Sequence, residues 1–212
     1  MPSNYRYIVV EGPIGAGKTS LARLLAEHFS GELLLESPGE NPFLANFYRD
    51  PRRWALATQL FFLFQRVNQL GGLKQFDLFE RPTVADFLFE KDPLFARLNL
   101  LDQELALYQQ IYGHLSPQVP KPDLVIYLHA PPDRLLARVR RRGAAYEHGI
   151  TEDYLKRLNE AYVRFFHEYD SAPLLLVNTQ NLNFVDRRAD FDLLLRRIGE
   201  MRGPRESFNL GV

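Results

Sequence analysis

The sequence predicts an α/β fold in which a five-stranded parallel sheet is sandwiched between helices. Three observations support this prediction. Five apolar segments have the length and composition of strands, and the segments between them carry apolar residues at helical spacing. In addition, residues 123–129 and 173–177 are nearly continuous apolar runs. Such runs are typical of strands that are buried on both faces of a parallel sheet.

Each expected element follows from its local pattern. The strands are expected at residues 5–11, 32–36, 82–87, 123–130 and 173–179. Pro51 suits the first turn of a long helix that runs to about Leu70, where Gly71 and Gly72 are expected to end it. Because ligands of open α/β sheets bind at the carboxyl ends of the strands, the residues just after positions 11, 36, 86 and 130 are the first candidates for a site.

The bulk composition bounds the function. The 212 residues are expected to form one domain over positions 1–212. The chain has no cysteine, which excludes thiol chemistry and cysteine-bound zinc. Lys+Arg and Asp+Glu both number 26, and this balance argues against a nucleic-acid polymer as partner. No stretch has the length of a membrane span or the pattern of a signal peptide, so a cytoplasmic protein is expected.

A complete P-loop lies between the first expected strand and the helix after it. Its glycines let backbone N–H groups converge on an anion, and the helix N-terminus adds its positive dipole end. The lysine is expected to reach the β- and γ-phosphates, and the threonine hydroxyl to bind Mg²⁺. Nucleotide binding is therefore expected at Gly12, Pro13, Ile14, Gly15, Ala16, Gly17, Lys18, Thr19 and Ser20.

Two carboxylates close neighbouring strands. Glu36 is placed to take the proton from a hydroxyl that attacks the γ-phosphate, although a solvated loop acid explains it equally well, and Glu40 is the rival base. Asp86 is placed to bind Mg²⁺ or its waters at the end of a strand beside the P-loop. The alternative for Asp86 is the N-cap of the segment that follows.

Gln59 and Arg66 lie seven residues apart, and therefore on one face of the long expected helix. They emerge among aromatic and aliphatic residues, an arrangement that suits a flat heterocycle stacked on rings and read at its edge. The alternative is an amphipathic core helix whose Gln59 and Arg66 point to water.

Arginines recur every four residues at Arg134, Arg138 and Arg142 and so share a helical face, with Arg141 close by. Such a cluster suits the clamping of transferring phosphates, and a solvated, partly paired face is the alternative. The loop after Arg142 has the composition of a mobile lid, which we expect over about residues 138–150.

The order and identity of these residues resemble the motifs of the deoxynucleoside kinase family, and in particular those of its bacterial deoxyguanosine and deoxyadenosine kinase branch. The resemblance covers nearly the whole chain. It is carried by residues 11–19, Glu36, 41–44, Phe47-Tyr48, Trp54, Gln59, Arg66, 84–87, 125–130, Arg142-Gly143 and Tyr146-Glu147.

The resemblance implies a P-loop kinase fold with a short arginine-rich lid, ATP and Mg²⁺ as cofactors, and a homodimer. It also implies roles for individual residues. Glu36 matches the base for the 5′-hydroxyl, Tyr48 and Glu147 the pair that holds the sugar 3′-hydroxyl, and Gln59 the amide that reads the base edge. Arg66 matches an arginine of members that take purines or deoxycytidine, and Arg138 and Arg142 match lid arginines on the phosphates.

One departure from the family pattern leaves two alignments open. Many members carry an acid-Arg-Ser triplet after the third strand. Aligning Asp86 with its acid places Phe87 where the arginine stands. The competing alignment puts Glu80 and Arg81 in the triplet and makes Asp86 a base-reading acid, although Pro82 weakens it.

The function expected from these residues is the ATP- and Mg²⁺-dependent phosphorylation of the 5′-hydroxyl of a purine deoxynucleoside. Arg66 can donate to guanine O6 and N7. Deoxyguanosine is favoured over deoxyadenosine, because residues 84–87 resemble the deoxyguanosine branch of the family more closely. A nucleoside-monophosphate kinase of the thymidylate kinase type and a regulatory P-loop subunit that needs a partner chain are the alternatives. The apolar segment 100–111 suits either a dimer interface or the core.

Overall fold

The structure is a computed structural model that describes residues 5–73, 81–116 and 119–210. Its described residues form one parallel sheet with the strand order β2-β3-β1-β4-β5-β6. The strands are β1 (Tyr7–Glu11), β2 (Glu32–Leu34), β3 (Thr83–Ala85), β4 (Leu124–His129), β5 (Leu174–Asn178) and β6 (Arg205–Phe208). The five predicted strands are confirmed, each slightly shorter than expected.

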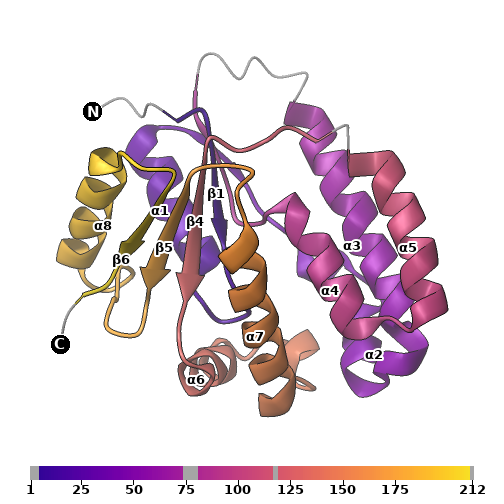
Figure 1. Cartoon of the computed structure of the whole chain (residues 1–212). Coiled ribbons are helices and arrows are strands. Elements are labelled where there is room, and N and C mark those ends of the chain that lie inside the picture. Colours follow the sequence, from indigo (N-terminus) through magenta and orange to yellow (C-terminus); the bar gives the residue numbers. More distant parts are fainter. Residues whose placement is uncertain (1–4, 74–80, 117–118, 211–212) are drawn as a thin grey trace.

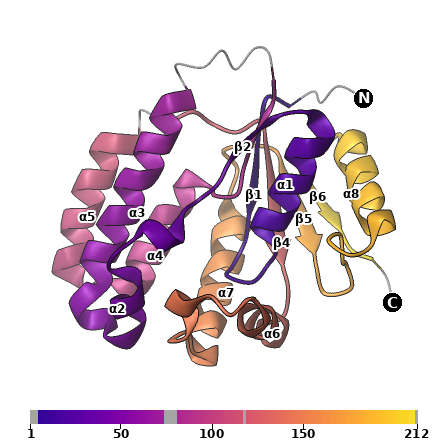
Figure 2. The ribbon, with the colours of Figure 1, turned by 180° about the vertical axis from the view of Figure 1, so that it is seen from behind.

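Helices cover both faces of the sheet (Figures 1 and 2). They are α1 (Lys18–Phe29), α2 (Leu44–Arg49), α3 (Pro51–Leu73), α4 (Asp92–Asn99), α5 (Asp102–Leu115), α6 (Pro132–Arg142), α7 (Glu152–Glu168) and α8 (Arg188–Glu200). Single turns of 3₁₀-helix span Pro38–Glu40, Phe89–Lys91 and Ala145–Glu147. In the part of the chain that is described, no helix is at once long and apolar enough to cross a membrane.

The central strand β1 divides the core into two halves. Tyr7 and Val9 pack with residues of α3, α4, α5 and α7 on one face. Ile8 and Val10 pack with residues of α1 and α8 on the other. This alternation is what a pleated strand requires when both faces are covered.

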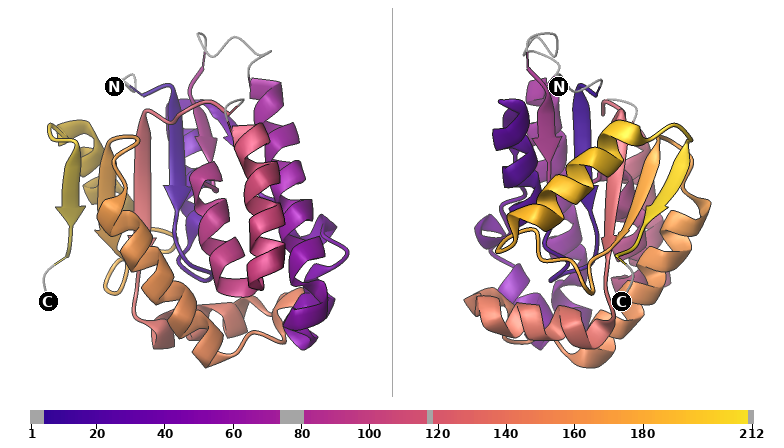
Figure 3. Two further views of the ribbon diagram at one scale, coloured as in Figure 1. Left: turned by 45° about the vertical axis from the view of Figure 1, so that its right-hand side comes forward. Right: turned by 90° about the vertical axis from the view of Figure 1, so that its left-hand side faces the viewer.

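The prediction of five strands was wrong, because β6 adds a sixth that pairs in parallel with β5 (Figure 3). The strand lies at the edge of the sheet and alternates exposed and half-buried residues, so it has no continuous apolar run. Arg205 instead ties it to the C-terminal end of α7, by donating hydrogen bonds to the carbonyl oxygens of Phe166 (2.8 Å), His167 (3.3 Å) and Tyr169 (2.7 Å).

The predicted end of the long helix was also wrong. Helix α3 continues through Gly71 and Gly72 to Leu73. Neither glycine has a positive φ, and a Cβ at either would meet no atom within 4 Å. Nothing at these positions therefore requires the left-handed backbone with which glycine usually ends a helix.

We predict that Arg205→Ala lowers the free energy of unfolding by about 1 kcal/mol, because three carbonyl oxygens lose a charged donor at a partly solvated site. Urea denaturation measures this change. Arg23→Ala, at an exposed position of α1, is the control and should change stability by less than about 0.5 kcal/mol. Equal effects of the two substitutions would show that Arg205 does not hold β6.

Candidate active site

The P-loop follows β1 and leads directly into α1. Its glycines are required by geometry at two positions. A Cβ at Gly12 would lie 2.3 Å from the carbonyl oxygen of Leu128 in β4, and one at Gly15, where φ is +86°, would lie 2.6 Å from that of Leu135 in α6. Only glycine allows this close approach, so the loop fits tightly against β4 and α6.

Lys18 begins α1, and its Nζ atom donates hydrogen bonds to the carbonyl oxygens of Gly12 (2.7 Å) and Pro13 (3.3 Å). The ammonium thus lies against the loop that precedes it. Burial lowers the pKa of Lys18, the nearby charge of Glu11 raises it, and that of Lys91 lowers it.

A pocket beside the P-loop, here called the acceptor pocket, brings together side chains from widely separated segments. Its walls come from the P-loop, the segment after β2, α2, α3, the segment after β3, α4, the end of α6 with the 3₁₀ turn after it, and α7. Most of the predicted site residues line it: Ile14, Gly15, Lys18, Thr19, Glu36, Tyr48, Gln59, Arg66, Asp86, Arg142 and Glu147.

Glu36 lies at the centre of an ionic cluster in this pocket. Its Oε1 atom accepts hydrogen bonds from Nε (2.8 Å) and a terminal nitrogen of Arg66, and Lys91 Nζ lies 3.6 Å away. Burial raises the pKa of Glu36, but the charges of Arg66, Lys91 and Lys18 outweigh it and lower the pKa to about 2. The solvated loop acid is therefore the wrong interpretation, whereas the rival Glu40 is exposed and accepts a hydrogen bond from Gln65.

Asp86 directly follows β3 and links the P-loop to Glu36. Its Oδ2 atom accepts a hydrogen bond from the Thr19 hydroxyl (2.5 Å), and Oδ1 accepts one from the backbone N–H of Glu36 (2.7 Å). Burial raises its pKa, and these two hydrogen bonds lower it in part. The N-cap alternative was wrong, because the next helical turn has Leu88 at its N-cap.

Gln59 and Arg66 are both buried, at 4% exposure, and both line the acceptor pocket. The alternative in which they point to water was wrong. Besides its two bonds to Glu36, Arg66 donates to Oδ1 of Asp92, so three of the five guanidinium N–H groups face carboxylates. Phe62 packs under the guanidinium, with its ring centre 5.1 Å from Cζ.

Residues of the segment predicted to be a lid line the same pocket. Arg142 at the end of α6 donates from Nε to Oε2 of Glu147 (3.0 Å) and from a terminal nitrogen to Oε1. The Arg142 side chain is 48% exposed, whereas that of Glu147 is 6% exposed. Tyr48 lines the pocket with Glu147, so the predicted pair lies on one wall. Burial raises the pKa of Tyr48 well above its ordinary value.

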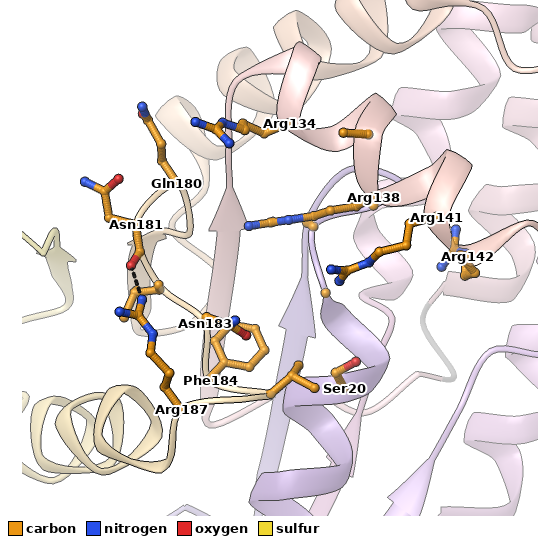
Figure 4. A pocket seen from close by; sticks show the side chains of 16 residues that line it. Ser20, Arg134, Arg138, Arg141, Arg142, Gln180, Asn181, Asn183, Phe184 and Arg187 are labelled. Carbon is orange, nitrogen blue, oxygen red and sulfur yellow. Dashed lines mark hydrogen bonds between the residues drawn. The ribbon is translucent and has the colours of Figure 1, made fainter.

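A second pocket, here called the donor pocket, lies on the other side of the P-loop (Figure 4). Four of the five arginines of α6 (Arg134, Arg138, Arg141 and Arg142) line it, together with residues of the 180–187 segment. Ala16, Gly17 and Ser20 form its floor. Arg138 donates to the hydroxyl (2.9 Å) and the carbonyl oxygen (2.7 Å) of Thr179. Gly15 and Arg142 border both pockets.

Comparison with known proteins identifies the family of the chain. A family model described as "Deoxynucleoside kinase" matches residues 8–201. The chain belongs to the deoxynucleoside kinase family. Enzymes of this family are phosphotransferases that act on a hydroxyl of a nucleoside.

Two bacterial relatives of this kinase cover most of its length. It is 33% identical over 200 residues to the deoxyguanosine kinase of Bacillus subtilis, with 92% of this chain and 97% of the relative covered. It is 31% identical over 215 residues to the deoxyadenosine kinase of Lactobacillus acidophilus, with 92% and 98% covered. The predicted resemblance is thereby confirmed.

A solved structure confirms the kinase fold. The deoxyadenosine kinase of M. mycoides with the products dCMP and a flexible dCDP superposes with a TM-score of 0.81 at 24% identity, covering 92% of this chain and 100% of the other.

The structure argues against one of the two alignments of the family's acid-Arg-Ser triplet. Arg81 is exposed and precedes the amino end of β3, on the opposite edge of the sheet from the P-loop, so the alignment that made it functional was wrong. Glu80 lies outside the described residues. The alignment of Asp86 with the acid stays a prediction, and Phe87, which would then stand at the position of the arginine, is fully buried.

Sequence reasoning missed three features of the site. Asp92 accepts from Arg66 through Oδ1, its Oδ2 atom has no hydrogen-bond partner among the described residues, and burial raises its pKa to about 6. Lys91 lies beside Glu36, and the 180–187 segment walls the donor pocket. Lys91 and Asp92 could have been noticed because they follow the end of a strand within a few residues. The 180–187 segment could have been noticed because it begins, just after β5, with several side-chain amides.

We predict that Glu36→Gln makes the free energy of unfolding depend less on pH in the acidic range. The folded pKa of Glu36 is about 2, below its ordinary value of 4.5. Its contribution to stability is therefore present above pH 4.5 and is lost as the pH falls toward 2. Denaturation in urea at a series of pH values measures this. Glu40→Gln should keep the wild-type pH dependence, and an unchanged pH dependence in Glu36→Gln would contradict the assigned pKa.

Proposed function

We propose that this kinase transfers the γ-phosphoryl group of ATP to the 5′-hydroxyl of a purine deoxynucleoside, with deoxyguanosine preferred and deoxyadenosine next. The observation that carries the proposal is the place of Glu36. It is a half-buried carboxylate, 16% exposed, whose low pKa keeps it ionised, and it lines one pocket with Lys18 of the P-loop. A nucleotide phosphate and a hydroxyl acceptor can therefore meet at this point.

Glu36 accepts the proton of the attacking hydroxyl. A carboxylate with a pKa of about 2 is a weak base but remains ionised throughout the neutral range. In phosphoryl transfer the protein mainly positions the groups and neutralises charge, so a weak, well-placed acceptor suffices. The bonds from Arg66 hold the Glu36 carboxylate in one orientation.

The rest of the acceptor pocket holds the nucleoside. Tyr48 and Glu147 hold the 3′-hydroxyl of the sugar, and the buried amide of Gln59 reads the edge of the base. Phe62 and Phe95 line the pocket and offer flat apolar surface to a heterocycle. The names of the two relatives, a deoxyguanosine kinase and a deoxyadenosine kinase, support a purine.

The P-loop and the donor pocket bind ATP. Arg138 and Arg142 bind its phosphates, because both guanidinium groups border the donor pocket next to the P-loop. Thr19 and Asp86 fit Mg²⁺, since a hydroxyl and a carboxylate oxygen lie 2.5 Å apart beside Lys18. Bound there, Mg²⁺ would neutralise charge on the ATP phosphates.

We extend the proposal to a homodimer that is formed through α3 and α5. Three large apolar side chains on these helices are exposed: Phe64 of α3 (47%), Leu101 at the N-cap of α5 (61%) and Leu107 within α5 (48%). Large apolar side chains exposed on neighbouring helices are typical of an interface between copies.

The first experiment is a substrate panel. Mg·ATP is offered with each of the four deoxynucleosides and with thymidine monophosphate, and ADP formation is measured. We expect the highest kcat/KM for deoxyguanosine, the next for deoxyadenosine, and little transfer to thymidine. Transfer to the monophosphate alone would favour the nucleoside-monophosphate kinase. ATP binding without transfer would favour a regulatory subunit.

A second prediction concerns the base. Glu36→Gln should lower kcat by about 10²- to 10⁴-fold, because the amide cannot take the hydroxyl proton. The affinity for the nucleoside should change much less, as isothermal titration calorimetry would show. Glu40→Gln is the matched control and should keep wild-type turnover. Near-normal turnover of Glu36→Gln would rule out Glu36 as the base.

A further inference from the structure

Lys91 is a buried ammonium to which neither the sequence patterns nor the mechanism above gives a role. It ends the 3₁₀ turn Phe89–Lys91 and immediately precedes α4. Its side chain is 2% exposed, yet it lines the acceptor pocket together with Lys18, Glu36 and Asp86. A lysine is rarely buried this deeply unless it is paired with opposite charge.

The two carboxylates beside Lys91 already have other partners. Lys91 Nζ lies 3.1 Å from Oε2 of Glu11 and 3.6 Å from Oε1 of Glu36. Glu11 also accepts from the backbone N–H groups of Gly12 (2.8 Å) and Leu88 (2.6 Å) and from the hydroxyl of Tyr162 (2.8 Å). Glu36 accepts from Arg66. Lys91 is thus not the donor on which either carboxylate depends.

The ammonium has donor capacity left for a ligand. It carries three N–H groups, and within residues 5–73, 81–116 and 119–210 the two carboxylates are its only close acceptors. Lys91 also acts electrostatically on Lys18, whose pKa it lowers. Two ammonium groups therefore lie near one another where a P-loop lysine meets the acceptor pocket.

We propose that Lys91 is a catalytic residue whose ammonium contacts the γ-phosphoryl group during transfer, alongside Lys18. This inference rests on the proposed function. In the step, the 5′-oxygen of the nucleoside forms a bond to the γ-phosphorus, and the bond from that phosphorus to the β–γ bridging oxygen breaks. The hydroxyl proton moves to Glu36, and ADP leaves with the bridging oxygen.

The timing of charge favours this role. As Glu36 takes the proton, one of the two negative charges beside Lys91 disappears. The ammonium then attracts the oxygens of the transferring phosphoryl group more strongly, at the stage where that group needs stabilisation. A cation placed in this way acts more on the transition state than on the bound nucleoside.

The test compares Lys91→Met and Lys91→Arg, with Lys156→Met at an exposed position of α7 as the matched control. We expect Lys91→Met to lower kcat at least 100-fold, with less than a threefold change in nucleoside affinity. The kcat of Lys91→Arg should be at least tenfold higher than that of Lys91→Met, and the kcat of Lys156→Met should equal that of the wild type. An analogue that joins adenosine to deoxyguanosine through five phosphates should bind at least tenfold more weakly to Lys91→Met.

Other results would overturn the proposal. A kcat for Lys91→Met within threefold of the wild type would do so, as would equal losses of affinity for the nucleoside and for the analogue. If Lys91→Met does not fold, Glu11→Gln is compared with Glu11→Gln/Lys91→Met, which has neither buried charge. A kcat at least 100-fold lower in the double variant than in Glu11→Gln would support the proposal. If Glu11→Gln folds and the double variant does not, Lys91 has a structural role and the proposal is overturned.

The substrate panel keeps this test separate from that of the proposed function. If the wild-type chain transfers no phosphoryl group to a deoxynucleoside, the proposed function fails. If the wild type is active and Lys91→Met is equally active, only the role of Lys91 fails.

Discussion

The site depends on the pairing of opposite charges that are largely buried beside the P-loop. Glu11, Glu36 and Asp92 form ion pairs with Arg66 and Lys91, and none of the five is more than slightly exposed. A buried charge without a partner is costly, so the elements that carry these groups must meet in one arrangement. The cluster joins β1, the segment after β2, α3 and the start of α4. Residues that are distant in the sequence are thereby held together at the acceptor pocket.

The parallel sheet supplies the frame for this cluster. Since β1, β3 and β4 run in the same direction, their carboxyl ends meet at one edge, where α6 lies (Figure 1). Glu11 ends β1 and accepts from Gly12, the first residue of the P-loop. Asp86, one residue past β3, accepts from Thr19 of the same loop. The acceptor side and the phosphate side are thus connected through short, charge-assisted hydrogen bonds rather than through flexible linkers.

The predictable features were those with a local or periodic cause. The P-loop is read from adjacent residues, the buried strands from continuous apolar runs, and Glu36 and Asp86 from their place after strands. The remaining features depend on tertiary partners. The strand β6 is held by Arg205 and by pairing to β5, and its polar residues give no strand pattern. Single charged residues such as Lys91 and Asp92 resemble surface residues in the sequence, because only the fold shows that they are buried against Arg66 and Glu36. For the same reason the sequence indicated the face on which Arg66 lies but not the carboxylates that it contacts.

The ion pair between Arg142 and Glu147 has a thermodynamic consequence. Arg142 borders both pockets, whereas its partner is buried on the acceptor side. A ligand phosphate that draws the guanidinium away from Glu147 changes the charge and the free hydrogen-bonding capacity of the opposite wall. Linkage makes this effect reciprocal: whatever factor the first ligand contributes to the affinity of the second, the second contributes to the affinity of the first. Such a displacement would couple the two pockets through a single side chain, and the order in which they fill would affect the route but not the total free energy of the ternary complex.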